Sequence, residues 1–416
     1  MRTLSRTLAL TFAVALLFLQ SADAQLLRDL QNYRTPGQDG VNVFEAPKEG
    51  VGDFEGLYLR PGGDFAIQFQ GLEQSNDMNN LLDLAPNLTL PSANLNLDVQ
   101  FTEGLRMHLR TYLSSKHHTE SWVKGGYLQV DNLDFITEGF LSGVMEHTRF
   151  RFGMDEINFG DTHFRRSDNA GAIYNPFVEN YIMDAFTTEP FAEVTVMKSG
   201  FLGVAGVSNG RLNQTPTSGD NGVSLFGKVG YDSQVNEDLR LRLTGSVYHS
   251  TSQGTSDYLY NGDRAGSRYV KILATEESAS DFHPRFNPGF PNLTSFQVNP
   301  FAKFRGLEFF GVYERSECGT EHGGAYTQLG GEMLYRLGNR EQFYVGGRYN
   351  TVFGESTVDG PKQEIDRINV GGGWFLTPNV LSKIEYVTSS YDGAGFTDRF
   401  AGAKYNGIVL EAVVSF

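Results

Sequence analysis

The sequence predicts an all-β fold, a transmembrane antiparallel β-barrel of about 16 strands, within a range of about 14 to 18. Many segments alternate apolar and polar residues, short turns alternate with long polar connections, and the first residues are typical of an export signal. The composition agrees, since 48 Gly, 32 Phe and 19 Tyr stand against 14 Pro and 2 Trp. A mean hydropathy of −0.31 does not oppose a membrane barrel, because alternating strands average out their apolar residues.

Residues 1–24 are predicted to be a cleaved signal peptide. Two Arg residues precede an apolar run at 8–19, and the small residues at 21–24 suit signal peptidase. The alternative is a membrane anchor, but a spanning helix needs about twenty apolar residues and this run is shorter. We therefore expect an exported protein whose mature chain begins at Gln25.

The mature chain is predicted to have two parts. Residues 25–53 lack strand alternation and are expected to form a periplasmic N-terminal tail or a small plug, whereas 54–416 are expected to form the barrel. A single Cys318 excludes an intramolecular disulfide framework and a multi-Cys zinc site. The formal charge of −15 argues against a nucleic-acid partner, whose binding surface is normally basic.

Four segments alternate so regularly that their two faces follow from parity. Apolar residues recur at alternate positions in 95–101, 105–110, 239–247 and 408–416, with polar residues on the opposite parity, which in 408–416 are Glu411 and Ser415. The first two are separated only by 102–104 and so predict a hairpin. Less regular strands are expected at 64–70, 122–130, 148–153, 191–197, 201–208, 224–231, 296–304, 307–313, 328–337, 343–349, 368–376 and 382–386.

The lengths of the connections predict which rim is periplasmic and which is extracellular. Turns at 102–104, 198–200 and 305–306 are tight, whereas 250–295 is long and polar and is expected to be an external loop. Short periplasmic turns and long extracellular loops are the barrel pattern. A soluble β-sandwich would also alternate, but it does not account for the paired connection lengths or for the amphipathic strand that ends on Phe416.

The parity opposite the apolar face predicts the pore lining. Its cations are Arg106, Arg110, Arg149, Arg151, Arg240, Arg242, Lys303, Arg305, Arg336 and Arg348. Rings of charge in a water-filled passage set ion preference, so a cationic wall would favour anions. The alternative is that these cations form ion pairs that brace the barrel and have no part in selectivity.

The segment 155–186 joins two predicted strands and is unusually rich in charge. We expect it to leave the wall, because lipid-exposed irregular backbone is unfavourable, and to fold into the pore as a constriction loop. An outer loop that never enters the pore is the alternative. Its candidate constriction residues are Asp155, Glu156, Asp161, Arg165, Arg166, Asp168 and Asp184.

This segment also carries a resemblance to a known family. The stretch 158–169, NFGDTHFRRSDN, followed by NPFV at 175–178 and NYIMD at 180–184, resembles the phosphate-selective-porin-like outer-membrane porins of Gram-negative bacteria. The closing strands at 383–387 and 404–416 are similar to those of the same family. The likeness runs through most of the mature chain in order and is sharpest in these patches.

The resemblance implies a location and partners. It implies a homotrimer of barrels in the cell outer membrane, in contact with its lipid and lipopolysaccharide, and Phe416 as a signal read by the barrel-assembly machinery. It implies that small hydrophilic solutes pass, phosphate among them. Family members that select phosphate have a lumen dominated by Arg and Lys, whereas Arg165 and Arg166 here lie among acids, so phosphate is only one candidate solute.

We therefore expect a water-filled channel for passive diffusion, with no cofactor, no metal and no enzymatic activity. No nucleophile elbow is present, and neither His117 with His118 nor Cys318 with His322 completes a tetrahedral metal site. The alternative function is a structural or adhesive barrel that is plugged by its loops and acts through 250–295.

Overall fold

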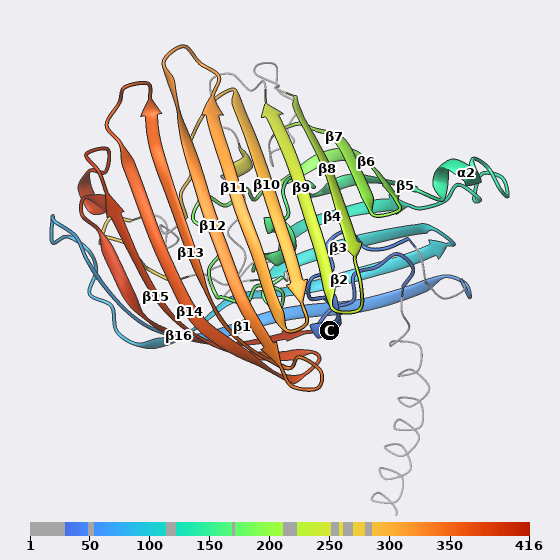
Figure 1. The fold of residues 1–416 in the computed structure, drawn as a ribbon, viewed down its shortest axis with the longest axis horizontal. Helices are drawn as coiled ribbons and strands as arrows, with labels where there is room; N and C mark the ends of the chain where they lie inside the picture. Colours follow the sequence, from blue (N-terminus) through green and yellow to red (C-terminus); the bar gives the residue numbers. More distant parts are fainter. Residues whose placement is uncertain are drawn as a thin grey trace, which may run out of the picture.

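The computed structural model describes residues 30–48, 54–113, 122–168, 171–210, 223–250, 258–260, 269–278 and 285–416. The predicted signal peptide, residues 1–24, lies outside this part of the chain. The described chain forms a closed barrel in which each strand pairs antiparallel with its neighbours in sequence and β1 pairs with β16 (Figure 1). The predicted barrel of 16 strands is confirmed.

Each predicted strand segment coincides with one observed strand, although the observed strands are mostly longer. The strands are β1 (Tyr58–Ser75), β2 (Asn87–Thr102), β3 (Leu105–Leu113), β4 (Trp122–Val130), β5 (Thr148–Glu156), β6 (Thr188–Lys198), β7 (Phe201–Ser208), β8 (Ser224–Gln234), β9 (Leu239–Ser250), β10 (Leu293–Phe304), β11 (Leu307–Cys318), β12 (Gly323–Leu337), β13 (Phe343–Thr357), β14 (Gln363–Thr377), β15 (Val380–Asp392) and β16 (Lys404–Ser415).

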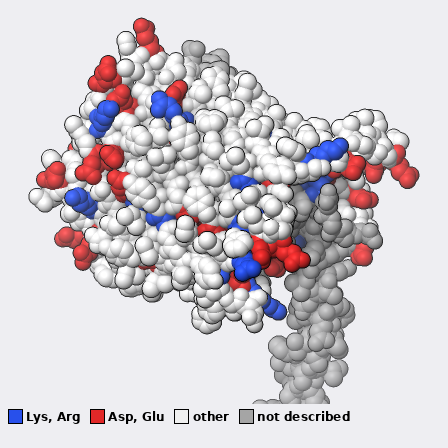
Figure 2. All heavy atoms as spheres, in the orientation of Figure 1, with Lys and Arg blue, Asp and Glu red and all other residues white. Residues whose placement is uncertain are grey.

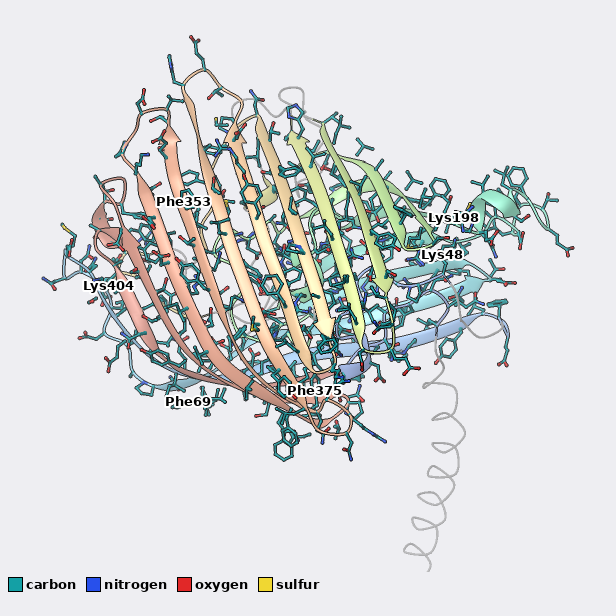
Figure 3. The ribbon with its side chains drawn as sticks, in the orientation of Figure 1. Lys48, Phe69, Lys198, Phe353, Phe375 and Lys404 are labelled. Atoms are coloured by element: carbon teal, nitrogen blue, oxygen red, sulfur yellow. The ribbon has the colours of Figure 1, made fainter. Side chains whose placement is uncertain are left out.

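Alternation along each strand separates an apolar outer face from a polar inner face. On β1, Phe65, Ile67 and Phe69 are exposed on the outside, while Gln68 and Gln70, at the alternate positions, are buried inside. Figure 3 labels Phe69 on this outer face. Much of the wall visible in Figure 2 is free of charged side chains, which gather toward the strand ends. This is the arrangement that a lipid-facing barrel requires.

The two rims differ in the length of their connections. One rim has tight turns such as Ser199-Gly200, where φ angles of 50° and 83° suit a two-residue hairpin turn. It also carries one longer connection, 131–147, which contains the short helix α2 (Ser142–Met145). The opposite rim has the long connections 157–187 and 251–292. Among the residues described, none of the helices has the length and apolar character needed to cross a membrane.

The barrel closes where β1 meets β16. Phe416 continues this pairing beyond the strand, because its amide donates to the carbonyl of Gly63 at 3.0 Å and its carbonyl accepts from the amide of Gly63 at 3.1 Å. The Phe416 side chain is about half exposed on the barrel surface. These contacts complete the seam of the sheet.

Deletion of Phe416 should reduce the yield of folded barrel several-fold. It removes two seam hydrogen bonds and a lipid-facing ring at the point where the sheet closes. Heat-modifiable migration on a gel measures the folded fraction. Phe353→Ala, which removes an outward ring of β13 away from the seam, is the control (Figure 3). Equal yields from the two variants would show that Phe416 has no special part in closure.

Candidate functional site

The connection between β5 and β6, residues 157–187, folds into the barrel. The amide of Ile182 donates to the side-chain oxygen of Asn350 at 2.7 Å, and the amide of Met183 donates to that of Gln328 at 2.9 Å. Polar side chains of the inner wall thus satisfy the loop backbone, which irregular chain away from water requires. The wall therefore fixes the loop inside the lumen.

Asp161 anchors the beginning of this loop to the wall. Its carboxylate accepts from Lys228 of β8 at 2.9 Å and from Arg242 and Thr244 of β9 at 2.8 Å each. Burial alone would raise the pKa of Asp161, but Lys228 and Arg242 hold that pKa well below its usual range. Asp161 is therefore a charged, fully buried anchor.

Arg165 anchors the loop to the other side of the wall. It lies in the short 3-10 helix η3 (Thr162–Arg165) and pairs with Glu308 at 2.7 Å and Glu332 at 2.5 Å. These two carboxylates also bind Arg336 and Arg348, each at 2.7 Å. Three guanidinium groups thus share two carboxylates, all of them nearly inaccessible to solvent.

The remaining loop charges brace the loop itself. Arg166 pairs with Asp184 and lies 3.7 Å from Asp168. The Asn180 amide donates to Asp168 at 2.7 Å and to Asp184 at 3.0 Å. These two acids therefore face the loop's own arginine and not the wall cations. The described part of the loop thus has its own polar core.

The N-terminal segment, residues 30–48, also lies inside the barrel. Glu45 pairs with Arg242 at 2.8 Å, and the Asn42 amide donates to Glu308 at 2.7 Å. The ring centroids of Phe44 and Phe301 of β10 lie 5.3 Å apart. This segment therefore contacts the same wall residues that hold the loop.

The N-terminal segment and the loop also contact each other. The Arg34 guanidinium donates to the carbonyl of Phe164 at 3.0 Å and stacks 3.6 Å from the ring centroid of Tyr174. The Tyr174 hydroxyl donates to the carbonyl of Thr35 at 3.0 Å. Burial lowers the pKa of Arg34 to about 10, so the guanidinium stays charged at neutral pH. Arg34 therefore joins the segment to the loop.

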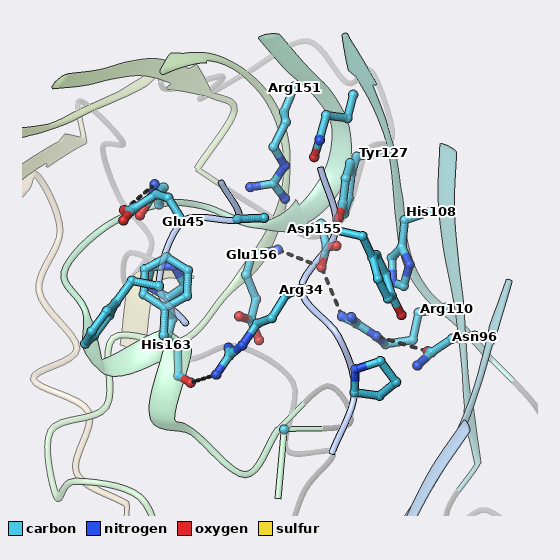
Figure 4. A pocket seen from close by; sticks show the side chains of 18 of the residues that line it. Arg34, Glu45, Asn96, His108, Arg110, Tyr127, Arg151, Asp155, Glu156 and His163 are labelled. Atoms are coloured by element: carbon cyan, nitrogen blue, oxygen red, sulfur yellow. Dashed lines mark hydrogen bonds and ion pairs between the residues drawn. The ribbon is translucent and has the colours of Figure 1, made fainter. Parts of the chain in front are cut away.

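Four predicted wall cations meet around one cavity of about 220 Å³ (Figure 4). They are Arg106 and Arg110 of β3 and Arg149 and Arg151 of β5. Each of them forms an ion pair with an acid at 2.7 to 3.3 Å. The pairs are Arg106 with Asp98, Arg110 with Asp155, Arg149 with Asp131 and Arg151 with Glu193. Asp155, Glu156 and Asp168 line the same cavity. The cations thus line a space and form ion pairs at the same time.

Four other predicted cations line a second cavity, of about 780 Å³, at the short-turn rim; these are Arg240, Lys303, Arg305 and Arg336. Arg240 pairs with Asp232 at 2.7 Å, Lys303 with Glu341 at 2.5 Å, and Arg305, at the edge, with Asp238 at 3.2 Å. The last two predicted cations contact the loop attachments instead. Arg242 binds the anchor Asp161, and Arg348 binds Glu332, the wall carboxylate that Arg165 also binds.

Parts of the connection 250–295 enter the lumen from the opposite rim, whereas the sequence pattern predicted an external loop. The Tyr260 hydroxyl donates to Glu314 at 2.7 Å, and the amide of Leu273 donates to Gln74 at 2.6 Å. Tyr260, Tyr269 and Leu273 are fully buried. Aromatic and aliphatic residues inside a mostly polar stretch explain why these described parts pack against the wall.

Sequence reasoning missed several lumen residues. Lys228 stands opposite the exposed Leu225 and Val229, so the same parity would have identified it as inward-facing. Arg367 and Lys383, which donate to backbone carbonyls of the loop, follow the same rule. Arg34 and Glu45 carry no such signal, because their segment does not alternate.

The described residues give no indication of a metal site. No group of three or more His, Cys, Asp or Glu in this part of the chain is placed to hold a metal ion. His117 and His118 lie outside the described residues. The Cys318 thiol lies 3.5 Å from the carbonyl of Pro291 and 3.1 Å from the Thr320 hydroxyl.

Acidification should loosen the loop through His163. Burial, and then the charges of Lys228 and Arg166, lower the pKa of His163 well below its ordinary value of 6.5. A detached loop would bind a proton below about pH 6.5 while the docked loop would not, so docking weakens as the pH falls toward the docked-state pKa. Single-channel recordings should show more frequent current fluctuations at pH 5 than at pH 7, and His163→Asn should reduce this difference. An equal pH response in the variant would rule out His163 as the cause.

A closed, outwardly apolar barrel whose lumen holds a long folded loop is the architecture of outer-membrane barrels. No family model and no curated protein matches the sequence. Among solved structures, the chain is similar to OmpT of Vibrio cholerae, with a TM-score of 0.54, 12% identity, and coverage of 88% of this chain and 100% of that one.

Two further structures are similar to the same degree. The outer membrane channel DcaP of Acinetobacter baumannii has a TM-score of 0.54 at 12% identity, over 88% of this chain and 99% of that one. An anion-selective porin from Comamonas acidovorans has a TM-score of 0.54 at 9% identity, over 86% of this chain and 100% of that one. At such low identity these likenesses show a shared fold.

Proposed function

We propose that this protein is an outer-membrane porin that forms a water-filled channel for passive diffusion of small hydrophilic solutes. The observation that carries the proposal is the pairing of an apolar outer wall with a charged lumen, in which a folded loop leaves polar cavities lined by arginines. The similarity in fold to a channel and to a porin supports it. Outer-membrane lipid and lipopolysaccharide would surround the apolar wall.

The selectivity that we propose is a modest preference for anions. The 220 Å³ cavity has five Arg and six acidic residues in its lining, and the 780 Å³ cavity has five cations and four acids. This near balance does not favour a phosphate-specific pore, so phosphate remains one candidate among small anions. The excess of cations at the short-turn rim is the feature that would attract anions.

Neutralising two wall cations tests this proposal. Arg106→Gln with Arg110→Gln leaves Asp98 and Asp155 without their arginine partners, so the lumen becomes more negative. We expect the reversal potential in a salt gradient to shift toward cation preference while the barrel still assembles. Arg315→Gln removes an exposed charge from the outer face and should leave the reversal potential unchanged. No shift in the double variant would overturn the wall-cation role.

A plugged structural barrel is a second candidate function. The contacts that residues 30–48 and 157–187 make with the wall favour it, because both segments occupy the lumen together. We propose that the N-terminal part, 25–53, acts as a plug on the short-turn side. Stepwise conductance of the purified protein in a planar bilayer would support the porin, and well-folded protein that conducts no current would support the structural barrel.

The remaining functional expectations are proposals as well. We propose that three copies associate in the membrane and that the barrel-assembly machinery recognises the strand that ends at Phe416, both on the family resemblance. Chemical cross-linking in the membrane tests the first. That the protein is no enzyme stays a prediction. A turnover lost on substitution of a single lumen side chain would contradict it.

A further inference from the structure

The connection 131–147 is an exception on its rim, where the neighbouring connections are short. All residues from 134 to 144 are exposed. Five of them are large and apolar, with exposed fractions between 43% and 59%; these are Phe135, Ile136, Phe140, Leu141 and Val144. Figure 1 shows α2 projecting away from the barrel wall. An apolar surface of this kind normally marks a site of contact.

This projection is an ordered structure. The Asp134 carboxylate accepts from the amide of Gly139 at 2.8 Å, which closes the first turn of the connection. At its base, the amide of Asp131 donates to the carbonyl of Gly104 at 2.6 Å, and the amide of Met197 donates to the carbonyl of His147 at 2.8 Å. The apolar side chains are therefore held outward by a fixed backbone.

The projection leaves the barrel at the height of an aromatic belt. Near the same rim, Phe201 and Tyr231 form an exposed pair with ring centroids 4.9 Å apart, and Phe343 stacks on Trp374 at 5.6 Å. Such belts mark the boundary between lipid and water. Beside the projection, Phe150 of β5 continues the exposed apolar wall. The apolar side chains of 131–147 thus extend the lipid-facing surface outward along this boundary.

The charges of the connection indicate which lipid it would contact. Asp134, Glu138 and Glu146 are exposed, and residues 131–147 contain neither Lys nor Arg. An anionic lipid surface would repel these carboxylates. We propose that 131–147 docks its apolar side chains into a zwitterionic phospholipid surface on the short-turn side of the membrane.

Depth-dependent quenching tests the docking. Val144→Cys in a Cys318→Ser background, labelled with an environment-sensitive dye, is reconstituted in phosphatidylcholine vesicles that contain a lipid spin-labelled near the headgroup. Glu103→Cys, on the neighbouring tight turn, is the matched water-facing control, and Leu243→Cys on the outer face of β9 is the lipid-facing control. We expect the dye at 144 to be quenched about threefold more than the dye at 103. Phosphatidylglycerol added to the vesicles should reduce the quenching by about half.

Each other outcome has a distinct meaning. Equal quenching at 144 and 103, with strong quenching at 243, would overturn the docking and leave the barrel in the membrane. Weak quenching at all three positions would overturn the membrane location itself. A dye at 144 that is shielded only at high protein density would show that a second copy covers the surface, which contradicts a lipid partner.

Discussion

Deletion of residues 30–48 should raise the single-channel conductance by about two- to threefold, because a segment that fills part of an aqueous pore leaves it. In this segment Glu45 forms ion pairs with Arg242 and Lys228. Asn42 donates a hydrogen bond to Glu308, and the ring of Phe44 packs on that of Phe301. Removal of the segment frees lumen volume and leaves Arg242 with fewer carboxylates nearby, so anion permeability should rise with the conductance. Planar-bilayer recordings of the two proteins give both quantities.

Two single substitutions distinguish obstruction of the pore by this segment from a general effect of the deletion on folding. Glu45→Gln keeps the segment but weakens its attachment to Arg242, so it should give brief openings that reach toward the larger conductance of the deletion variant. Glu364→Gln, which removes an exposed carboxylate near the other rim, is the control and should behave like the unmodified protein. A deletion variant that folds normally and conducts no better would show that 30–48 does not obstruct the pore.

The fold could be predicted because a barrel strand carries its signal locally. Successive side chains face lipid and lumen in turn. The alternation of Phe65 and Ile67 with Gln68 therefore identifies the strand, and shows which of its faces is turned to lipid, without knowledge of the neighbouring strands. The closing contact between Phe416 and Gly63 could not be predicted in this way, since pairing between distant strands depends on register.

The interior of the lumen could be predicted only in part. Parity places Arg165's partners, Glu308 and Glu332, on the inner wall, but it does not indicate which loop reaches them. The segment 30–48 lacks any periodicity, and its position depends on single contacts such as that between Arg34 and Tyr174. Irregular segments are positioned by specific hydrogen bonds and ion pairs, and these become visible only when the three-dimensional structure is known.

Arg165→Ala should release the loop 157–187 from the wall and destabilise its docked state by about 3 kcal/mol. This is the lower end of the range for breaking a buried ion pair, since Arg336 and Arg348 stay beside the two carboxylates that lose Arg165. We expect a lower midpoint of thermal unfolding, measured by heat-modifiable migration, and more frequent current fluctuations than in the unmodified channel at the same pH. Arg165→Lys should restore part of the stability because it keeps one charge.

Arg315→Ala is the matched control for this loss of a guanidinium. Arg315 pairs with Glu317 at 2.6 Å, but both side chains are about half exposed, so this pair should contribute only about 0.5 kcal/mol. The midpoint should therefore fall clearly for Arg165→Ala and hardly at all for Arg315→Ala. If both variants unfold at the same temperature and show equally few current fluctuations, the loop does not depend on Arg165, and its other wall contacts, such as those of Asp161 and Asn350, hold it in the lumen.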